Sequence, residues 1–106
     1  MERLPVSEFQ ILVALLSGAR HGAAIRDEVA ERTDDTVVLG PGTLYTSIKR
    51  LLGRGWIDET TSESTDVRRF YRLTAAGRSA LAQEVERLEQ DVAYARQRLR
   101  RRLRAT

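Results

Sequence analysis

Apolar residues recur along the first half of the chain at spacings of three and four, the period of an amphipathic helix. The pattern predicts one helix that begins at Ser7, a second over residues 23–32, and a third that begins at Pro41 and ends before Gly53. Ser7 with Gln10 three residues later has the form of a capping box. Proline is a favoured first residue of a helix. Three short helices are therefore expected before residue 53.

Two short alternating segments follow, over residues 56–61 and 68–73, and a polar stretch rich in turn residues separates them. This order predicts a β-hairpin. The β-branched segment 37–39 either pairs as a brief strand or fills part of the core. Helices followed by a hairpin have the layout of a winged helix-turn-helix.

The last part of the chain predicts one long helix, capped by Thr74 and running to about Arg102. Its apolar residues follow a heptad spacing, and we expect them to form a dimer interface: Leu81, Val85, Leu88, Val92, Ala95 and Leu99. At 1.5 Å per residue such a helix extends roughly 40 Å, longer than a small domain needs to cover its own core. The simplest partner for the seam is a second copy of the chain.

The third helix has two chemically different faces. Leu44, Ile48, Leu51 and Leu52 fall on one side, whereas Thr43, Thr46, Lys49 and Arg50 fall on the other, which carries no acidic residue. Hydroxyl and cationic side chains of this kind suit base edges and phosphates in the major groove of DNA. Tyr45 lies at the flank, where its hydroxyl could reach a phosphate or its ring could pack in the core.

Arg68 and Arg69 stand where the hairpin returns. They could contact phosphates or enter the minor groove beside the third helix. The alternative is a solvated strand end whose arginines pair with Asp58 or Glu59 across the hairpin.

Net charge gives little guidance about the partner. The total is +3, but residues 1–74 hold 10 basic against 11 acidic residues and residues 75–106 hold 8 against 4. Nucleic-acid binding must therefore depend on where cations stand. The arginine-rich end, from Arg96 to Arg104, could bind flanking DNA, neutralise acids such as Glu86 and Glu89 on an antiparallel partner helix, or remain solvated.

Catalytic, metal and membrane functions find no support in the chain. There is no cysteine, and His21 is the only histidine, so we expect a turn or cap role for it and no metal site. No phosphate-binding loop or catalytic constellation is present, so we predict neither an enzyme nor a cofactor. We expect a cytoplasmic protein, because no secretory signal or membrane-spanning segment is seen.

A set of spaced motifs resembles the PadR family of bacterial transcriptional regulators. The motifs are His21-Gly22, Gly42-Thr43-Leu44-Tyr45, Ile48-Lys49-Arg50-Leu51, Gly55-Trp56-Ile57 and Arg68-Arg69-Phe70-Tyr71-Arg72-Leu73-Thr74-Ala75-Ala76-Gly77-Arg78. The resemblance covers about residues 7 to 90. The chain departs from the family at Ala23, where many members carry an aromatic residue.

The resemblance implies a mainly α fold with a small β-hairpin wing, divided into a DNA-binding domain over 1–74 and a dimerisation helix with an arginine-rich tail over 75–106. It implies a homodimer that represses a promoter by binding an inverted repeat in double-stranded DNA and is released by a small hydrophobic molecule at the dimer interface. Some short members hold flat drugs between aromatic side chains, whereas Tyr94 is the only aromatic residue of this helix. The DNA-contact candidates are Thr43, Tyr45, Thr46, Lys49, Arg50, Arg68 and Arg69.

Two other functions stay open at the level of sequence. The acidic first part of the chain suits a winged-helix module that binds another protein and not DNA. A small ligand-binding sensor or enzyme is the third possibility.

Overall fold

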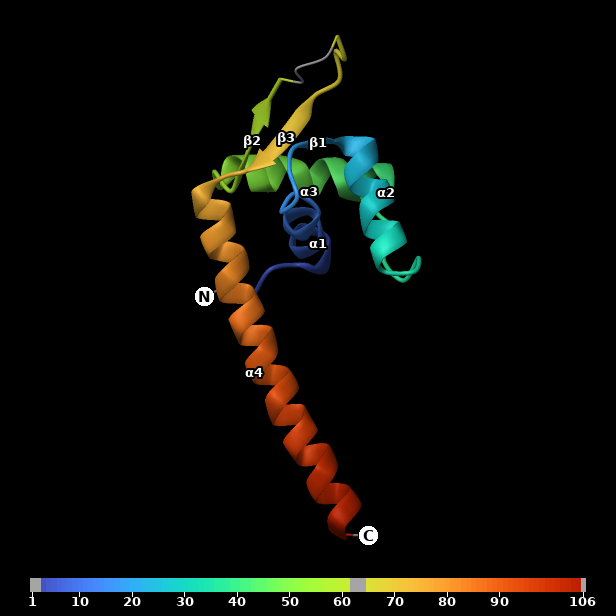
Figure 1. Cartoon of the computed structure of the whole chain (residues 1–106), viewed down its shortest axis with the longest axis vertical. Helices are drawn as coiled ribbons and strands as arrows, with labels where there is room; N and C mark the ends of the chain where they lie inside the picture. The colour runs from blue at the N-terminus through green and yellow to red at the C-terminus, as the bar shows by residue number, and fades with distance from the viewer. Residues whose placement is uncertain (1–2, 62–64, 106) are drawn as a thin grey trace.

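A computed structural model of the chain describes residues 3–61 and 65–105, so the centre of the predicted polar turn, 62–64, lies outside the described residues. The elements are α1 (Val6–Ala14), β1 (Arg20–His21), α2 (Gly22–Arg32), α3 (Pro41–Gly53), β2 (Ile57–Thr60), β3 (Phe70–Leu73) and α4 (Ala75–Ala105). This is the predicted winged helix-turn-helix with a long C-terminal helix. Figure 1 shows the hairpin at one end of the molecule and the free half of α4 at the other.

The sheet has three antiparallel strands in the order β1-β3-β2. Ile57 pairs with Leu73 and Thr60 with Phe70, which confirms the predicted hairpin. The two-residue strand β1 was not predicted, and it pairs Arg20 with Tyr71. The chain between α1 and α2 is thereby fastened to the base of the hairpin.

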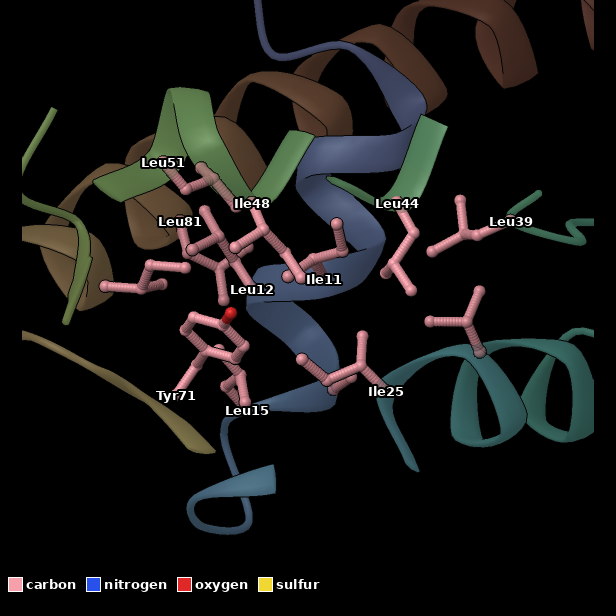
Figure 2. Close-up of a cluster of buried hydrophobic side chains, with 13 residues drawn as sticks. Ile11, Leu12, Leu15, Ile25, Leu39, Leu44, Ile48, Leu51, Tyr71 and Leu81 are labelled. Atoms are coloured by element: carbon pink, nitrogen blue, oxygen red, sulfur yellow. The ribbon is translucent and has the colours of Figure 1, made fainter. Parts of the chain in front are cut away.

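Helix α1 is the centre of the core, and it contacts α2, α3 and α4. Side chains from every helix and from the sheet converge on it (Figure 2). Ile11, Leu12, Ile25, Leu51 and Ile57 are almost completely buried. The segment 37–39 fills the core and forms no strand, since Leu39 is buried while Val38 is exposed.

The predicted capping box at Ser7 is wrong. Helix α1 begins one residue earlier, after Pro5, and no side chain caps it. The Ser7 hydroxyl instead lies 2.9 Å from the Ser47 hydroxyl, in a hydrogen bond that links α1 to α3. A contact between residues 40 positions apart therefore replaces the local cap.

The start of α4 is fixed to the base of the wing by a dense set of contacts. The Thr74 hydroxyl accepts a hydrogen bond from the Gly77 N–H at 3.0 Å, which confirms the predicted cap, and donates one to the Gly55 carbonyl at 2.7 Å. The Thr74 N–H donates to the Trp56 carbonyl at 3.0 Å. A Cβ atom at residue 77 would lie only 1.9 Å from that carbonyl oxygen, so the site requires glycine.

At the amino end, a cluster of charges holds the chain against α4. Arg3 reaches Glu84 at 3.1 Å and Asp91 at 3.2 Å, and Arg87 reaches Glu84 at 3.0 Å. Within the described residues, no helix has both the length and the apolar composition that crossing a bilayer requires.

Gly77→Ala is expected to destabilise the protein by about 2–3 kcal/mol, because the new methyl group meets backbone and no flexible side chain can move aside. Gly53→Ala is the matched control. Its Cβ would meet nothing within 4 Å, and the change in the free energy of unfolding should stay below about 1 kcal/mol. Urea unfolding at one fixed protein concentration measures both, and equal midpoints for the two variants would contradict the expectation.

Candidate nucleic-acid interface

Helix α3 keeps its two predicted faces apart. Leu44, Ile48 and Leu51 are buried against the core. The predicted DNA-contact residues of this helix are all exposed: Thr43, Tyr45, Thr46, Lys49 and Arg50. Tyr45 is 70% exposed, which excludes the core role that the sequence left open for it.

The amino end of α3 suits a negatively charged ligand. Gly40 precedes the helix in an extended conformation and Pro41 is its first residue, as predicted. No side chain caps the first turn and no acidic residue stands in it. Because the N–H groups of a first turn lack partners within the helix and carry partial positive charge, this end favours anions.

The arginines of the hairpin are all engaged by neighbouring acids. Arg68 lies beside Asp66, with Nε–Oδ distances of 3.0 and 3.1 Å. Arg69 reaches Glu59 across the hairpin at 3.6 Å, as the alternative interpretation anticipated. These are exposed ion pairs of low individual strength, so the guanidinium groups can exchange a carboxylate for another anion at little cost.

A hollow of about 400 Å³ lies between α2, α3 and β3. It brings Tyr45 of α3 together with Arg68 and Arg69 of the hairpin. The other DNA-contact candidates of α3 do not line it and continue the exposed face along the helix. Its apolar floor includes Leu44 and Ile48.

The sequence analysis did not anticipate that Arg26 also lines this hollow, as does Ala23. The departure from the family pattern at Ala23 was the available signal, because a small side chain at the start of α2 leaves space that a larger one would fill. The hollow adds a third cation to the two arginines of the hairpin.

His21 caps α2, as predicted. Its Nδ1 accepts a hydrogen bond from the Ala24 N–H at 3.2 Å. Its ring also meets the Phe70 ring edge to face, with centroids 5.4 Å apart. No group of three or more metal-binding side chains occurs among the described residues.

Arg50 has a second environment that its position in the sequence did not reveal. One of its terminal nitrogens lies 4.0 Å from the carboxylate of Glu8, a residue of α1 that is only 1% exposed. Lys49 makes no ion pair within the part of the chain that the structure describes. An alanine at position 50 would leave a buried carboxylate with less compensation, so Lys49 is the cleaner probe of the exposed face.

The predicted seam of α4 divides into two parts. Leu81 is 4% exposed and belongs to the core of its own chain, which leaves little of its surface for a second copy. Val85, Val92 and Leu99 are exposed, and so is Ala95. A groove of about 420 Å³ runs along this part of α4, lined by Phe9, Val85, Leu88, Glu89, Val92, Ala93 and Arg96.

Comparison with protein families gives a match over residues 11–83 to the family described as transcriptional regulator PadR-like. The matched segment extends from α1 into the first part of α4. It includes all the residues predicted to contact DNA.

Similar folds occur among solved structures. A transcriptional regulator of Clostridium thermocellum is 29% identical, with a TM-score of 0.75 over 87% of this chain and 90% of its own. A PadR family regulator of Clostridium difficile is 23% identical, with a TM-score of 0.78 over 90% of this chain and 99% of its own. Bacillus subtilis PadR in complex with operator DNA is 24% identical, with a TM-score of 0.66 over 76% of this chain and 46% of its own.

The Asp66–Arg68 pair allows a prediction about pH. The Arg68 side chain, which hydrogen-bonds to the Asp66 carboxylate, and the Arg68 backbone N–H hold the pKa of Asp66 at about 2, below its ordinary value of 3.8. Because the pKa is lowered in the folded state, the pair stabilises the protein above pH 3.8 and stops doing so as the pH falls through about 2.

Arg68→Ala should raise the pKa of Asp66 toward 3.8, as measured by the carboxyl ¹³C shift during an acid titration. Arg72→Ala is the control, since Arg72 pairs with Asp58 at 2.7 Å. An Asp66 carboxyl that titrates near 3.8 in the unmodified protein would contradict the assigned pair.

Proposed function

The chain belongs to the PadR-like family of transcriptional regulators, and from this premise we propose that it is a homodimeric repressor that binds an inverted repeat in double-stranded DNA. Membership of the family confirms the predicted resemblance, the DNA-binding regulatory function and the expectation that the chain is not an enzyme. The repressor role, the dimer, its effector and a cytoplasmic location are our proposals.

The observation that carries the proposal is the separation of faces on α3. Thr43, Thr46 and Lys49 stand open to solvent, while the leucine side of the same helix is hidden against α1. A helix of 13 residues is about 20 Å long, and the major groove admits one helix of this width. Hydroxyl groups can bond base edges while lysine meets phosphate.

Further support comes from the hairpin. Its arginines share the hollow with Tyr45, so one continuous surface joins the start of α3 to the wing. We propose that Arg68 and Arg69 contact the backbone or the minor groove next to the bases met by α3, and that Tyr45 contacts a phosphate. Bacillus subtilis PadR, which shares the fold, has been crystallised with operator DNA.

We propose that a second copy covers the free half of α4. The groove along this helix combines apolar residues with one acid and one base, Glu89 and Arg96. An antiparallel copy would bring each Glu89 near the partner's Arg96, while Val85, Leu88, Val92, Ala95 and Leu99 meet their counterparts. The two-fold symmetry of such a dimer matches that of an inverted repeat.

The same groove is our candidate site for a small hydrophobic effector. Its lining is largely apolar, and Tyr94 is not part of it, so a ligand would be held by aliphatic contacts instead of aromatic stacking. We place the boundary between the DNA-binding domain (1–74) and the dimerisation helix (75–106) at the Thr74 cap.

Footprinting of the purified protein on the DNA upstream of its own gene tests the proposal most directly. A protected inverted repeat, with an affinity that falls steeply as salt is raised, is expected, because phosphate contacts release counterions. A folded protein that shifts no duplex at low salt would instead indicate a winged-helix module that binds another protein.

Lys49→Ala should weaken operator binding by about threefold to tenfold and reduce the salt slope by about one, because one phosphate contact is lost. Arg32→Gln is the matched control: Arg32 is a cation at the far end of α2, where it pairs with Glu28 at 2.8 Å. Fluorescence anisotropy over a salt series measures both variants. Equal losses for the two would show that only general charge matters.

Leu88→Asp should convert the dimer to a monomer, because a charge placed in an apolar interface is strongly disfavoured. Gln90→Asp is the control, since Gln90 lies outside the groove and is exposed. Sedimentation velocity gives the oligomeric state of each. A Leu88→Asp variant that stays dimeric would exclude this face of α4 as the interface.

A further inference from the structure

A buried carboxylate lies directly behind the proposed DNA-binding helix. Glu8 stands in the first turn of α1 and is 1% exposed. One of its oxygens, Oε1, accepts no hydrogen bond from any residue that the structure describes. The neighbouring Ser7–Ser47 hydrogen bond fastens α1 to α3 at this point, so the carboxylate cannot retreat to solvent without parting the helices.

Two arginines of α3 approach this carboxylate from its solvent side. A terminal nitrogen of Arg54 lies 3.7 Å from Oε1, and one of Arg50 lies 4.0 Å from Oε2. Both distances exceed that of a hydrogen bond, so the attraction is mainly coulombic. Arg54 is also held over the Trp56 ring at 4.9 Å, whereas 64% of the Arg50 side chain is exposed.

An acid in this place carries a cost that stability does not explain. Removing a carboxylate from water is unfavourable, and an apolar side chain of similar volume would fill the same space without that cost. The negative charge also opposes the approach of DNA. Its effect must therefore be sought in what it does to the arginine that bridges the buried side and the exposed face of α3.

We propose that Glu8 is a positioning residue for DNA recognition, which restrains Arg50 toward α1. This inference rests on the proposed function. An unrestrained arginine gains a phosphate contact on any duplex, whereas a restrained one meets DNA well only when the helix lies in its proper register. Restraint before binding also lowers the ordering cost of the correct complex. Glu8 thus lowers affinity for random DNA and raises discrimination.

Glu8→Gln tests this, because it removes the charge and keeps the shape. The arginines that it releases can reach water, so the variant is expected to fold. Binding is measured by anisotropy over a salt series, on the footprinted operator and on a scrambled duplex of the same composition. For the scrambled duplex we expect affinity to rise about threefold and the salt slope to steepen by about 0.9, the signature of one more phosphate contact. The ratio of operator to scrambled affinity should fall about threefold or more.

Glu84→Gln is the matched control. Glu84 is also nearly buried and paired with arginine, but it lies on α4. A role in stability alone would change the unfolding midpoint of both variants and the salt slope of neither. In an Arg50→Gln background, Glu8→Gln should no longer alter affinity or slope, because the effect passes through Arg50.

Glu8→Met repeats the measurement with an apolar chain of similar size if the amide is not tolerated. A salt slope and an affinity ratio equal to those of the unmodified protein, in either variant, would overturn the inference. So would a Glu8→Gln effect that persists in the Arg50→Gln background. Failure of the unmodified protein to bind any duplex would instead overturn the proposed function.

Discussion

The architecture depends on the contact between the Trp56 carbonyl and the start of α4. That single oxygen accepts the Thr74 N–H and lies against the bare Cα of Gly77, while the Thr74 hydroxyl holds the carbonyl of Gly55. The contact joins the end of α3, the first strand of the wing and the first turn of α4. It therefore sets the direction in which α4 leaves the domain relative to the helix proposed to read DNA. The molecule is 62 Å long and 28 Å across, so a small change of angle here moves the far end of α4 a long way (Figure 1).

Charge acts in this protein through position more than through amount. Residues 1–74 are nearly neutral in total, yet the exposed side of α3 carries no acid and the nearby hollow gathers three arginines. The acids that balance them stand at the side, as Asp66 and Glu59 do, or behind, as Glu8 does. The exposed partners hold the cations where a phosphate could take over, because ion pairs in water exchange readily. The buried partner is of another kind, since its charge cannot be screened by solvent.

Much of the fold could be predicted because the chain marks its elements locally. The bounds of α3 follow from Pro41 and Gly53, and the long C-terminal helix follows from its heptad spacing. What depends on distant contacts could not be predicted. The Ser7 cap failed because Ser47 takes its hydroxyl, and β1 is too short to show a period. Periodicity identified the apolar face of α4, but not that Leu81 serves its own core. The open residues of α3 could be chosen from the sequence, whereas the burial of Glu8 results from the packing of α1 on α3 and leaves no local signal.

The exposed apolar half of α4 has a consequence for how such a regulator would respond to its own abundance. If operator binding needs two copies joined through Leu88 and Val92, the dimer forms in proportion to the square of the monomer concentration. Promoter occupancy would then rise steeply around a threshold number of molecules per cell. The strength of one interface, tuned by a few aliphatic side chains, would decide how sharply the gene is shut off as the protein accumulates and how soon it reopens when cells divide and dilute it.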